Sequence, residues 1–240
     1  MKFLEPDKVY DLNGVTVKDY LLTEHNPYKI ELPKKRKNEL LGITIHNTEA
    51  IVQASGTTMS EQYTRATVYG NMGTTRVHYY VDDVEAWHNL PDNWIGWHAA
   101  DGSGNGNSST IAIEVIGKTA KAEENAARLA AALLKANGLP ENALYTHTHW
   151  LNVKAGKTGT REYLNTLHNI YKNCPAYILP HWSEFEKQVA EYYAAIPEEA
   201  ASVIYRIQVG AFAVRENADR FLEKVKAAGF DNAFITAVKK

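Results

Sequence analysis

The chain has 240 residues, of which 45% are hydrophobic and 22% charged, and this composition is typical of a folded globular protein. Its formal net charge of -2 gives no electrostatic basis for binding nucleic acid or an anionic membrane surface. The sequence contains no run of about 18 apolar residues, so we expect no membrane insertion. The length suits one large domain, or one medium domain with a small appendage.

The first 40 residues contain three prolines and the basic cluster KKRK at 34–37, which predicts a solvated turn before the first core strand. That strand is predicted over residues 41–46, LGITIH, a short apolar run rich in β-branched residues that ends in a histidine. A helix is predicted over residues 60–71. The stretch RVHYYVDD, residues 76–83, predicts another strand, and the following VEAWHNL is its predicted hairpin partner.

The stretch IAIEVIG, residues 111–117, is apolar on both faces apart from one glutamate, which predicts a strand in a central position. The clearest helical pattern of the chain follows and stops at Gly138. LYTHTHW, residues 144–150, is predicted to be extended, which would place its two histidines on the same side. A further helix is predicted over residues 181–195. This alternation of strands and helices predicts a layered α/β domain.

A small second unit is predicted at the C-terminus. Residues 196–202, IPEEAAS, predict a linker between a main domain over 1–195 and a tail over 203–240. In the tail, the alternation of apolar residues in VIYRIQVGAF predicts a first strand. VRENADRFLEKVKAAGF then predicts an amphipathic helix, and DNAFITAV predicts a second strand after it. Such a β-α-β unit is small for an independent hydrophobic core.

Cys174 is the only cysteine in the chain, so no internal disulfide can form. Three interpretations of its thiol stay open, namely an inert buried side chain, a nucleophile and a metal ligand. His46 ends a buried strand, and two histidines with one cysteine would supply the three protein ligands of a catalytic zinc site. His147 and His149 are the candidates for the second histidine. Pro175 counts against a nucleophile, because it lacks one backbone N–H group that would favour a thiolate.

Glu114 is the most anomalous carboxylate, because it stands between apolar residues of a predicted strand. Burying a bare carboxylate is costly, so this side chain is either paired with a cation on an open sheet face or functional. Burial would raise its pKa, which suits a general acid or base near neutral pH. The other polar candidates are Tyr79 and His98, and Trp94 and Trp97 are either sugar-stacking platforms or loop anchors.

Five stretches of the chain together carry a resemblance to a known family. In order, they are ITIHNTEA, RVHYYVDD, GWHAADG with NSSTIAIEV, YTHTHW and YKNCPAYIL. Over residues 38–195 the chain resembles the zinc-dependent N-acetylmuramoyl-L-alanine amidases of the type-2 amidase and peptidoglycan-recognition family. The resemblance implies a mixed central β-sheet flanked by helices, with Zn²⁺ bound in a groove.

The resemblance also implies roles for the candidate residues. The metal ligands would be His46, His147 and Cys174, with His149 and His168 as alternatives for the second histidine. Lys172 matches the family lysine that contacts the substrate or its developing oxyanion. Glu114 matches the acid/base glutamate found in part of the family, and Tyr79 matches a tyrosine used in other members. The side chains that would line the groove for glycan and stem peptide are Trp94, Trp97 and His98.

The implied reaction is hydrolysis of the amide between the lactyl group of N-acetylmuramic acid and L-alanine of the peptidoglycan stem peptide. In this scheme the proton is handled by Glu114 or by Tyr79. Two functions of other classes stay open. One is a non-catalytic peptidoglycan-recognition module, and the other is an endopeptidase with Cys174 as its nucleophile.

The tail resembles about half of a sporulation-related (SPOR) repeat, which binds the glycan strands of peptidoglycan. Because it holds one β-α-β unit where the repeat has two, we expect it to pair with a second copy in a homodimer. The N-terminal stretch MKFLEPDKVYDLNG lacks an apolar core of signal-peptide length. The combination resembles a phage or prophage endolysin, which is made in the bacterial host cytoplasm and acts on the cell wall after release.

Overall fold

A computed structural model describes residues 4–48, 56–197, 209–230 and 233–237 of the chain. The chain divides into two compact units, Met1–Ala201 and Ser202–Lys240.

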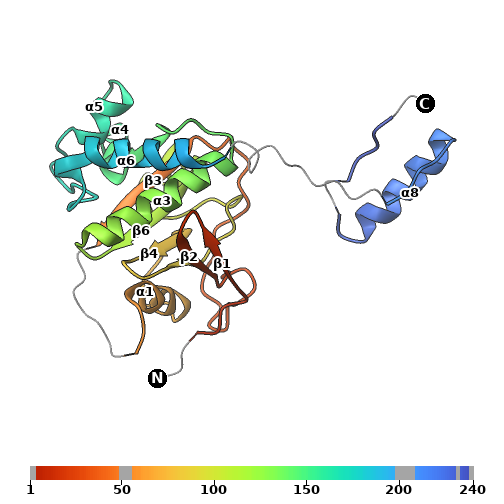
Figure 1. The fold of residues 1–240 in the computed structure, drawn as a ribbon, viewed down its shortest axis with the longest axis horizontal. Helices are drawn as coiled ribbons and strands as arrows, with labels where there is room; N and C mark the ends of the chain where they lie inside the picture. The colour runs from red at the N-terminus through yellow and green to blue at the C-terminus, as the bar shows by residue number, and fades with distance from the viewer. Residues whose placement is uncertain (1–3, 49–55, 198–208, 231–232, 238–240) are drawn as a thin grey trace. The chain divides into compact units, whose positions relative to one another are not determined.

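A seven-stranded sheet runs through the first unit, in the order β1-β2-β5-β4-β6-β3-β7 (Figure 1). Strands β1 with β2 and β4 with β5 pair antiparallel, whereas the other neighbours are parallel. The mixed sheet that the family resemblance implied is therefore confirmed. The strands are β1 Lys8–Leu12, β2 Val15–Asp19, β3 Gly42–Thr48, β4 Tyr79–Val81, β5 Ala86–His88, β6 Thr110–Ile116 and β7 Leu144–Thr146.

The apolar runs of the sequence correctly predicted β3, β4, β6 and the hairpin partner β5. The run with the single glutamate became β6, which lies in the interior of the sheet between β4 and β3. The hairpin of β1 and β2 was missed. Its turn is Asn13-Gly14, where both residues have positive φ, 57° and 81°. An Asn-Gly pair between alternating apolar residues is a strong hairpin signal, so the information was present in the sequence.

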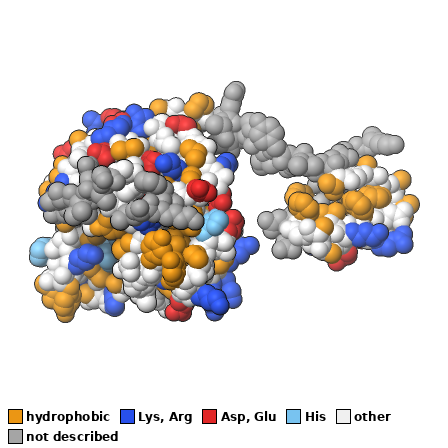
Figure 2. Space-filling view, turned by 90° about the horizontal axis from the view of Figure 1, so that it is seen from below, with side chains coloured by type: hydrophobic (Ala, Val, Ile, Leu, Met, Phe, Trp, Pro, Cys, Tyr) orange, Lys and Arg blue, Asp and Glu red, His pale blue; other side chains and the backbone are white. Residues whose placement is uncertain are grey.

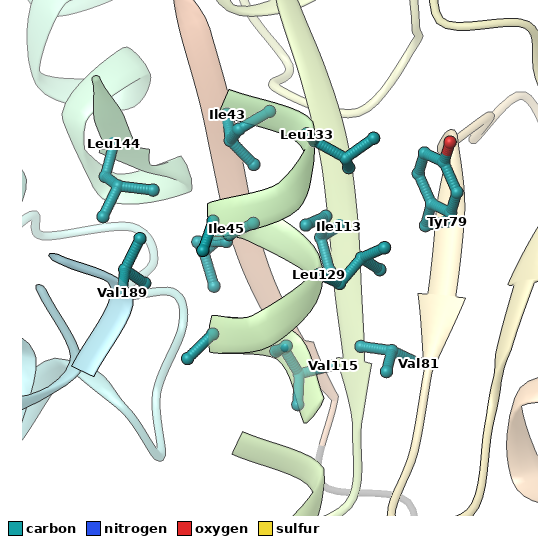
Figure 3. Packing of buried hydrophobic residues seen from close by; sticks show 14 of the residues in the cluster. Ile43, Ile45, Tyr79, Val81, Ile113, Val115, Leu129, Leu133, Leu144 and Val189 are labelled. Carbon is teal, nitrogen blue, oxygen red and sulfur yellow. The ribbon is translucent and has the colours of Figure 1, made fainter. Parts of the chain in front are cut away.

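Helices cover both faces of the sheet. Helices α3 and α6 lie side by side across one face (Figure 1), and the largest hydrophobic core fills the space beneath them (Figure 3). Helix α1 packs on the other face, where Met59 and Tyr63 contact a second, smaller core around Tyr80 and Ile116. The remaining short helices, α2, α4 and α5, lie in the loops and segments that surround the strand ends. The helices of this unit are α1 Met59–Val68, α2 Asn105–Ser109, α3 Ala120–Ala136, α4 His147–Lys154, α5 Arg161–Thr166, the 3₁₀ turn η1 Leu179–His181 and α6 Trp182–Ala195.

Threonine residues begin four of these helices. In each case the threonine hydroxyl accepts a hydrogen bond from a backbone N–H group of the first turn, which satisfies a donor that has no partner within the helix. These N-caps are Thr58, Thr119, Thr146 and Thr160. Among the described residues, no helix has the length and apolar character needed to cross a bilayer.

In the second unit, the described residues form one helix, α8 Arg215–Ala227, as predicted. The described parts of the two predicted strands, 209–212 and 233–237, have no regular structure, and the rest of both strands lies outside the described residues. None of the residues described in this unit is buried. Figure 2 shows hydrophobic side chains spread over the visible face of this unit, and the large exposed ones are Val209, Phe212, Val214, Phe230 and Phe234.

Candidate metal centre and active site

The register of three neighbouring strands decides which side chains share a face of the sheet. Parallel pairing places His46 of β3 opposite Glu114 of β6, and Glu114 opposite Tyr80 of β4. Side chains at paired positions point to the same face, and their sequence neighbours point to the other. Ile45 and Ile113 accordingly lie in the core beneath α3. His46 and Glu114 therefore project from the opposite face of the sheet.

His147 reaches the same place from the start of α4. The predicted extended stretch 144–150 is wrong in its second half, because β7 ends at Thr146 and the helix begins at His147. The physical reason is the N-cap, in which the Thr146 hydroxyl accepts a hydrogen bond from the backbone N–H of His149 at 2.9 Å. The ring of His147 lies 4.8 Å from the ring of His46, measured between centroids.

Cys174 is attached to α4 through Thr148. The Thr148 hydroxyl accepts a hydrogen bond from the Cys174 backbone N–H at 2.7 Å and donates one to the Cys174 carbonyl at 3.1 Å. The Thr148 backbone N–H donates to the same carbonyl at 3.0 Å. Three hydrogen bonds thus hold Cys174 beside His147, although Cys174 and Thr148 are 26 positions apart in the sequence.

Together these elements form a compact group of three buried side chains. The ligating atoms of His46, His147 and Cys174 all lie within 4.8 Å of one another. Both ring nitrogens of His147 are buried and make no hydrogen bond of good geometry within the part of the chain that the structure describes, although the Ala99 backbone lies close enough to influence the ring. Buried polar atoms without partners are costly, so this arrangement suits a bound ligand. Two imidazoles and one thiolate match the three protein ligands of a catalytic zinc site.

The electrostatics of the group also suit a cation. Burial lowers the pKa of His147 to about 4 and that of His46 well below its ordinary value, so both imidazoles are neutral and can donate a lone pair. Burial, with a smaller contribution from Glu114, raises the pKa of Cys174 to about 12. A thiol with such a pKa is a poor nucleophile, whereas a bound cation would favour its thiolate.

Glu114 and Lys172 lie beside the three candidate ligands. Burial raises the pKa of Glu114 to about 7, and the positive charge of Lys172 opposes this increase. The Lys172 side chain is exposed, and its charge also lowers the pKa of His46 and of His147. A carboxylic acid that titrates near neutral pH can both accept and donate a proton.

His98 is buried against the first candidate ligand. Its Nδ1 lies 2.9 Å from Nε2 of His46, and only 7% of the residue is exposed. Trp94 and Trp97 are half-buried in the same loop, where their backbones form isolated bridges with Lys35 and with Arg76. The structure thus brings His98 to the metal-ligand group, and the two tryptophans lie in the adjoining segment of the chain.

Tyr79, by contrast, is not brought to this group. Its position in β4 is paired with Ile113, so its side chain points into the core beneath α3 (Figure 3). There its hydroxyl donates to Asp92 at 3.0 Å and its ring stacks on His88. The expected proton-transfer role of Tyr79 is therefore corrected, because the sheet separates its hydroxyl from Glu114. The tyrosine on the face of Glu114 is Tyr80, and its hydroxyl is hydrogen-bonded to Thr67.

The two alternative histidines also lie elsewhere. His149 packs between Tyr145 and Trp150, with ring centroids 5.0 and 4.6 Å away. His168 is exposed and lines a surface cavity of about 330 Å³ with residues that include Thr166 and Pro180. Of the three candidates for the second histidine ligand, the structure brings His147 to His46 and Cys174.

The first unit also matches a known protein family. Residues 36–175, more than half of the chain, match the family described as N-acetylmuramoyl-L-alanine amidase. The chain belongs to this amidase family. Residues 193–240 match the SPOR domain, in agreement with the resemblance of the tail.

Individual relatives of this amidase-family chain come from Bacillus subtilis. The chain is 31% identical over 149 residues to the N-acetylmuramoyl-L-alanine amidase CwlH, a match that covers 60% of this chain and 50% of CwlH. It is 34% identical over 130 residues to XlyA, covering 52% of this chain and 41% of XlyA. The chain thus spans about half the length of the curated relatives it matches. A solved mutant endolysin is similar with a TM-score of 0.54 and 28% identity, over 73% of this chain and 99% of that one.

Sequence reasoning missed two residues that build the site of this amidase-family chain. Thr148 fixes the backbone of Cys174. Asn107 fixes the loop that carries His98, because its side-chain oxygen accepts the backbone N–H groups of His98 and Ala99 at 2.7 and 2.8 Å. Both act through the backbone groups of residues several to many positions away, so no local pattern marks them.

Proposed function

We propose that the protein is a zinc-dependent N-acetylmuramoyl-L-alanine amidase that hydrolyses the amide between N-acetylmuramic acid and L-alanine in peptidoglycan. The single observation that carries this proposal is the buried group of His46, His147 and Cys174 beside Glu114. Membership of the amidase family supports the choice of bond. The raised pKa of the buried Cys174 thiol counts against a cysteine endopeptidase.

His46, His147 and Cys174 would hold the metal in this proposal. Bound Zn²⁺ would supply Lewis-acid polarisation of the scissile carbonyl and activation of water. The protein's part is to present two neutral imidazoles and one thiol from three separate elements with little freedom to move. The sheet holds His46, the first turn of α4 holds His147, and Thr148 holds Cys174.

Glu114 would move the proton. Its carboxylate accepts a proton from the attacking water, and its carboxylic acid then donates that proton to the nitrogen of the departing L-alanine amine. The proton balance closes, since the group returns to its starting state after one turnover. A pKa of about 7 supports this double role, because neither form of the side chain is strongly disfavoured at neutral pH.

Lys172 would stabilise the negative charge that develops on the carbonyl oxygen. Its exposed ammonium group, two residues before Cys174, leaves it accessible to a substrate. Positive charge placed where an oxyanion develops is among the largest catalytic contributions. Trp94 and Trp97 would contact the glycan and stem peptide, which is supported by their half-buried rings in the loop that carries His98.

The second unit would bind the glycan strands of peptidoglycan, which is supported by its SPOR match. We further propose that two copies of the chain pair through this unit. The support is its exposed apolar side chains, among them Phe230 at 66% and Phe234 at 70% exposure, because apolar surface of this kind is usually covered in a stable fold. The protein would act as an endolysin, reaching the bacterial wall from the host cytoplasm where it is made.

The deciding experiment measures bound zinc and lysis of purified cell walls for the parent protein and for Cys174→Ser, with and without a chelator. We expect about one zinc per chain in the parent, lysis that the chelator abolishes, and new L-alanine amino termini in the digest. Lysis that survives the chelator but is lost in Cys174→Ser would instead establish a cysteine peptidase. Wall binding by the zinc-loaded parent without any release of amino termini would establish a recognition module.

A further inference from the structure

Each imidazole of a metal ligand has a second nitrogen, and its partner decides how the ring is oriented. In His46 that partner is His98. The two rings meet edge to face, with centroids 5.0 Å apart and planes at 88°, and Nε2 of His46 lies 2.9 Å from Nδ1 of His98. This hydrogen bond occupies Nε2 of His46 and leaves its Nδ1 for the metal-ligand group.

His98 is itself held from two sides. On the backbone side, Asn107 accepts the N–H groups of His98 and Ala99, and the Asn107 amide donates to the Gly102 carbonyl at 2.9 Å. On the ring side, a Cβ added to Gly96 would lie 2.5 Å from Cδ2 of the His98 ring. The backbone anchoring and this close approach leave the imidazole little freedom to rotate.

Asp101 reinforces the same loop. Its carboxylate accepts the backbone N–H groups of Gly106 and Asn107 at 2.8 and 3.2 Å. The Asp101 carboxylate and the Asn107 amide thus stabilise the segment between His98 and α2. Helix α2 is followed directly by β6, the strand that carries Glu114. A rigid support of this kind is what a side chain needs in order to orient its neighbour within a fraction of an ångström.

We propose that His98 is a positioning residue that fixes the orientation and the tautomer of His46, so that Nδ1 of His46 is the metal-binding atom. With the proton of neutral His46 on Nε2, this N–H donates to Nδ1 of His98. His98 then carries its own proton on Nε2, a buried atom that has no hydrogen-bond partner among the described residues. This inference rests on the proposed zinc site. It replaces the expected contact of His98 with substrate, for which a buried ring offers little surface.

The test compares the zinc affinity of purified full-length variants by competition with a chromophoric chelator. His98→Leu removes the hydrogen bond at similar volume, and His98→Asn offers an oxygen near the position of Nδ1. We expect an affinity loss of about 10- to 100-fold for His98→Leu, typical of lost outer partners of metal ligands, and about 3-fold or less for His98→Asn. Asn107→Ala, which keeps the ring but frees its backbone, should fall between them.

A matched control and a second readout separate a positioning role from a merely structural one. His149→Asn changes a buried histidine of α4 that lies outside the ligand group, and it should leave the zinc affinity unchanged. In the cobalt-substituted protein, His98→Leu should shift the visible absorption bands, while His98→Asn should not. Equal affinities and spectra for the parent and His98→Leu would overturn the inference. No zinc binding by the parent itself would overturn the proposed function instead.

Discussion

His46 and Glu114 are directly paired across the parallel strands β3 and β6. A candidate metal ligand and a candidate proton carrier therefore project side by side from the same rigid face, at the roughly 4.8 Å spacing of neighbouring strands. Neither needs a loop to bring it into place. Sites built on strands are more precisely held than sites built on loops, which suits a reaction in which water must lie between a metal and a base.

We expect the Glu114 carboxyl to titrate at about pH 7 in the metal-free protein, because burial disfavours its charged form. Lys172→Met should raise this pKa further, since the Lys172 charge lowers it, and bound zinc should lower it by direct attraction. Carbon-13 NMR of glutamate-labelled protein, with Glu114→Gln to assign the signal, measures all three values. A carboxyl that titrates near its ordinary value of 4.5 would contradict the burial argument.

Glu114→Gln should stabilise the metal-free protein at high pH while abolishing lysis. A carboxyl whose folded pKa is raised from 4.5 to about 7 destabilises the fold progressively as pH rises through this window. The greatest effect is roughly 3 kcal/mol above pH 8, since each pKa unit is worth about 1.4 kcal/mol. Urea unfolding of parent and variant at pH 5 and pH 8.5 tests the sign. If the variant's advantage in free energy of unfolding is no larger at pH 8.5 than at pH 5, the prediction is wrong.

Thr148→Val should weaken both the fold and the metal site. The substitution leaves the Cys174 N–H without its hydroxyl acceptor, which costs about 1–3 kcal/mol, and it releases the backbone of the cysteine ligand. We expect a zinc affinity about 10-fold lower, measured by chelator competition. Thr148→Ser keeps the hydroxyl and is the matched control. A loss in Thr148→Ser with none in Thr148→Val would show that the methyl group, rather than the hydrogen bonds, matters.

Tyr79→Phe should leave lysis within about 2-fold of the parent, because the Tyr79 hydroxyl points away from Glu114 into the network of Asp92. The cost should appear in stability instead, at about 1 kcal/mol for the lost hydrogen bond. Wall-lysis rates and thermal unfolding together test this. A loss of lysis above 100-fold with an unchanged unfolding temperature would return Tyr79 to the catalytic scheme.

The 240-residue chain should behave as a dimer in gel filtration with light scattering, and a version ending at residue 197 should be monomeric. The reason is the apolar surface of the second unit, in which none of the described residues is buried. Phe230→Ser together with Phe234→Ser should shift the full chain towards monomer. A monomeric parent at micromolar concentration would exclude this pairing.

The sequence predicted what local patterns control. Short β-branched runs predicted β3 and β6, and with them His46 and Glu114, because a buried run is a property of consecutive residues. The face on which a strand residue lies depends on its register with a neighbouring strand, so the orientation of Tyr79 towards the core beneath α3 could not be predicted from RVHYYVDD alone. The helix start at His147 was missed for a different reason, since the Thr146 cap competes with continuation of a strand.

The bonds between Thr148 and Cys174 have an evolutionary consequence. They fasten the two ends of the segment 149–173 directly to each other, so the ligand geometry does not depend on the exposed turn in the middle of this segment. Insertions, deletions or a transplanted loop at the exposed turn around Gly156 and Gly159 should leave the metal-binding group intact. The segment is thus a natural place for relatives to diversify, and for a designer to graft new contacts to different bacterial walls.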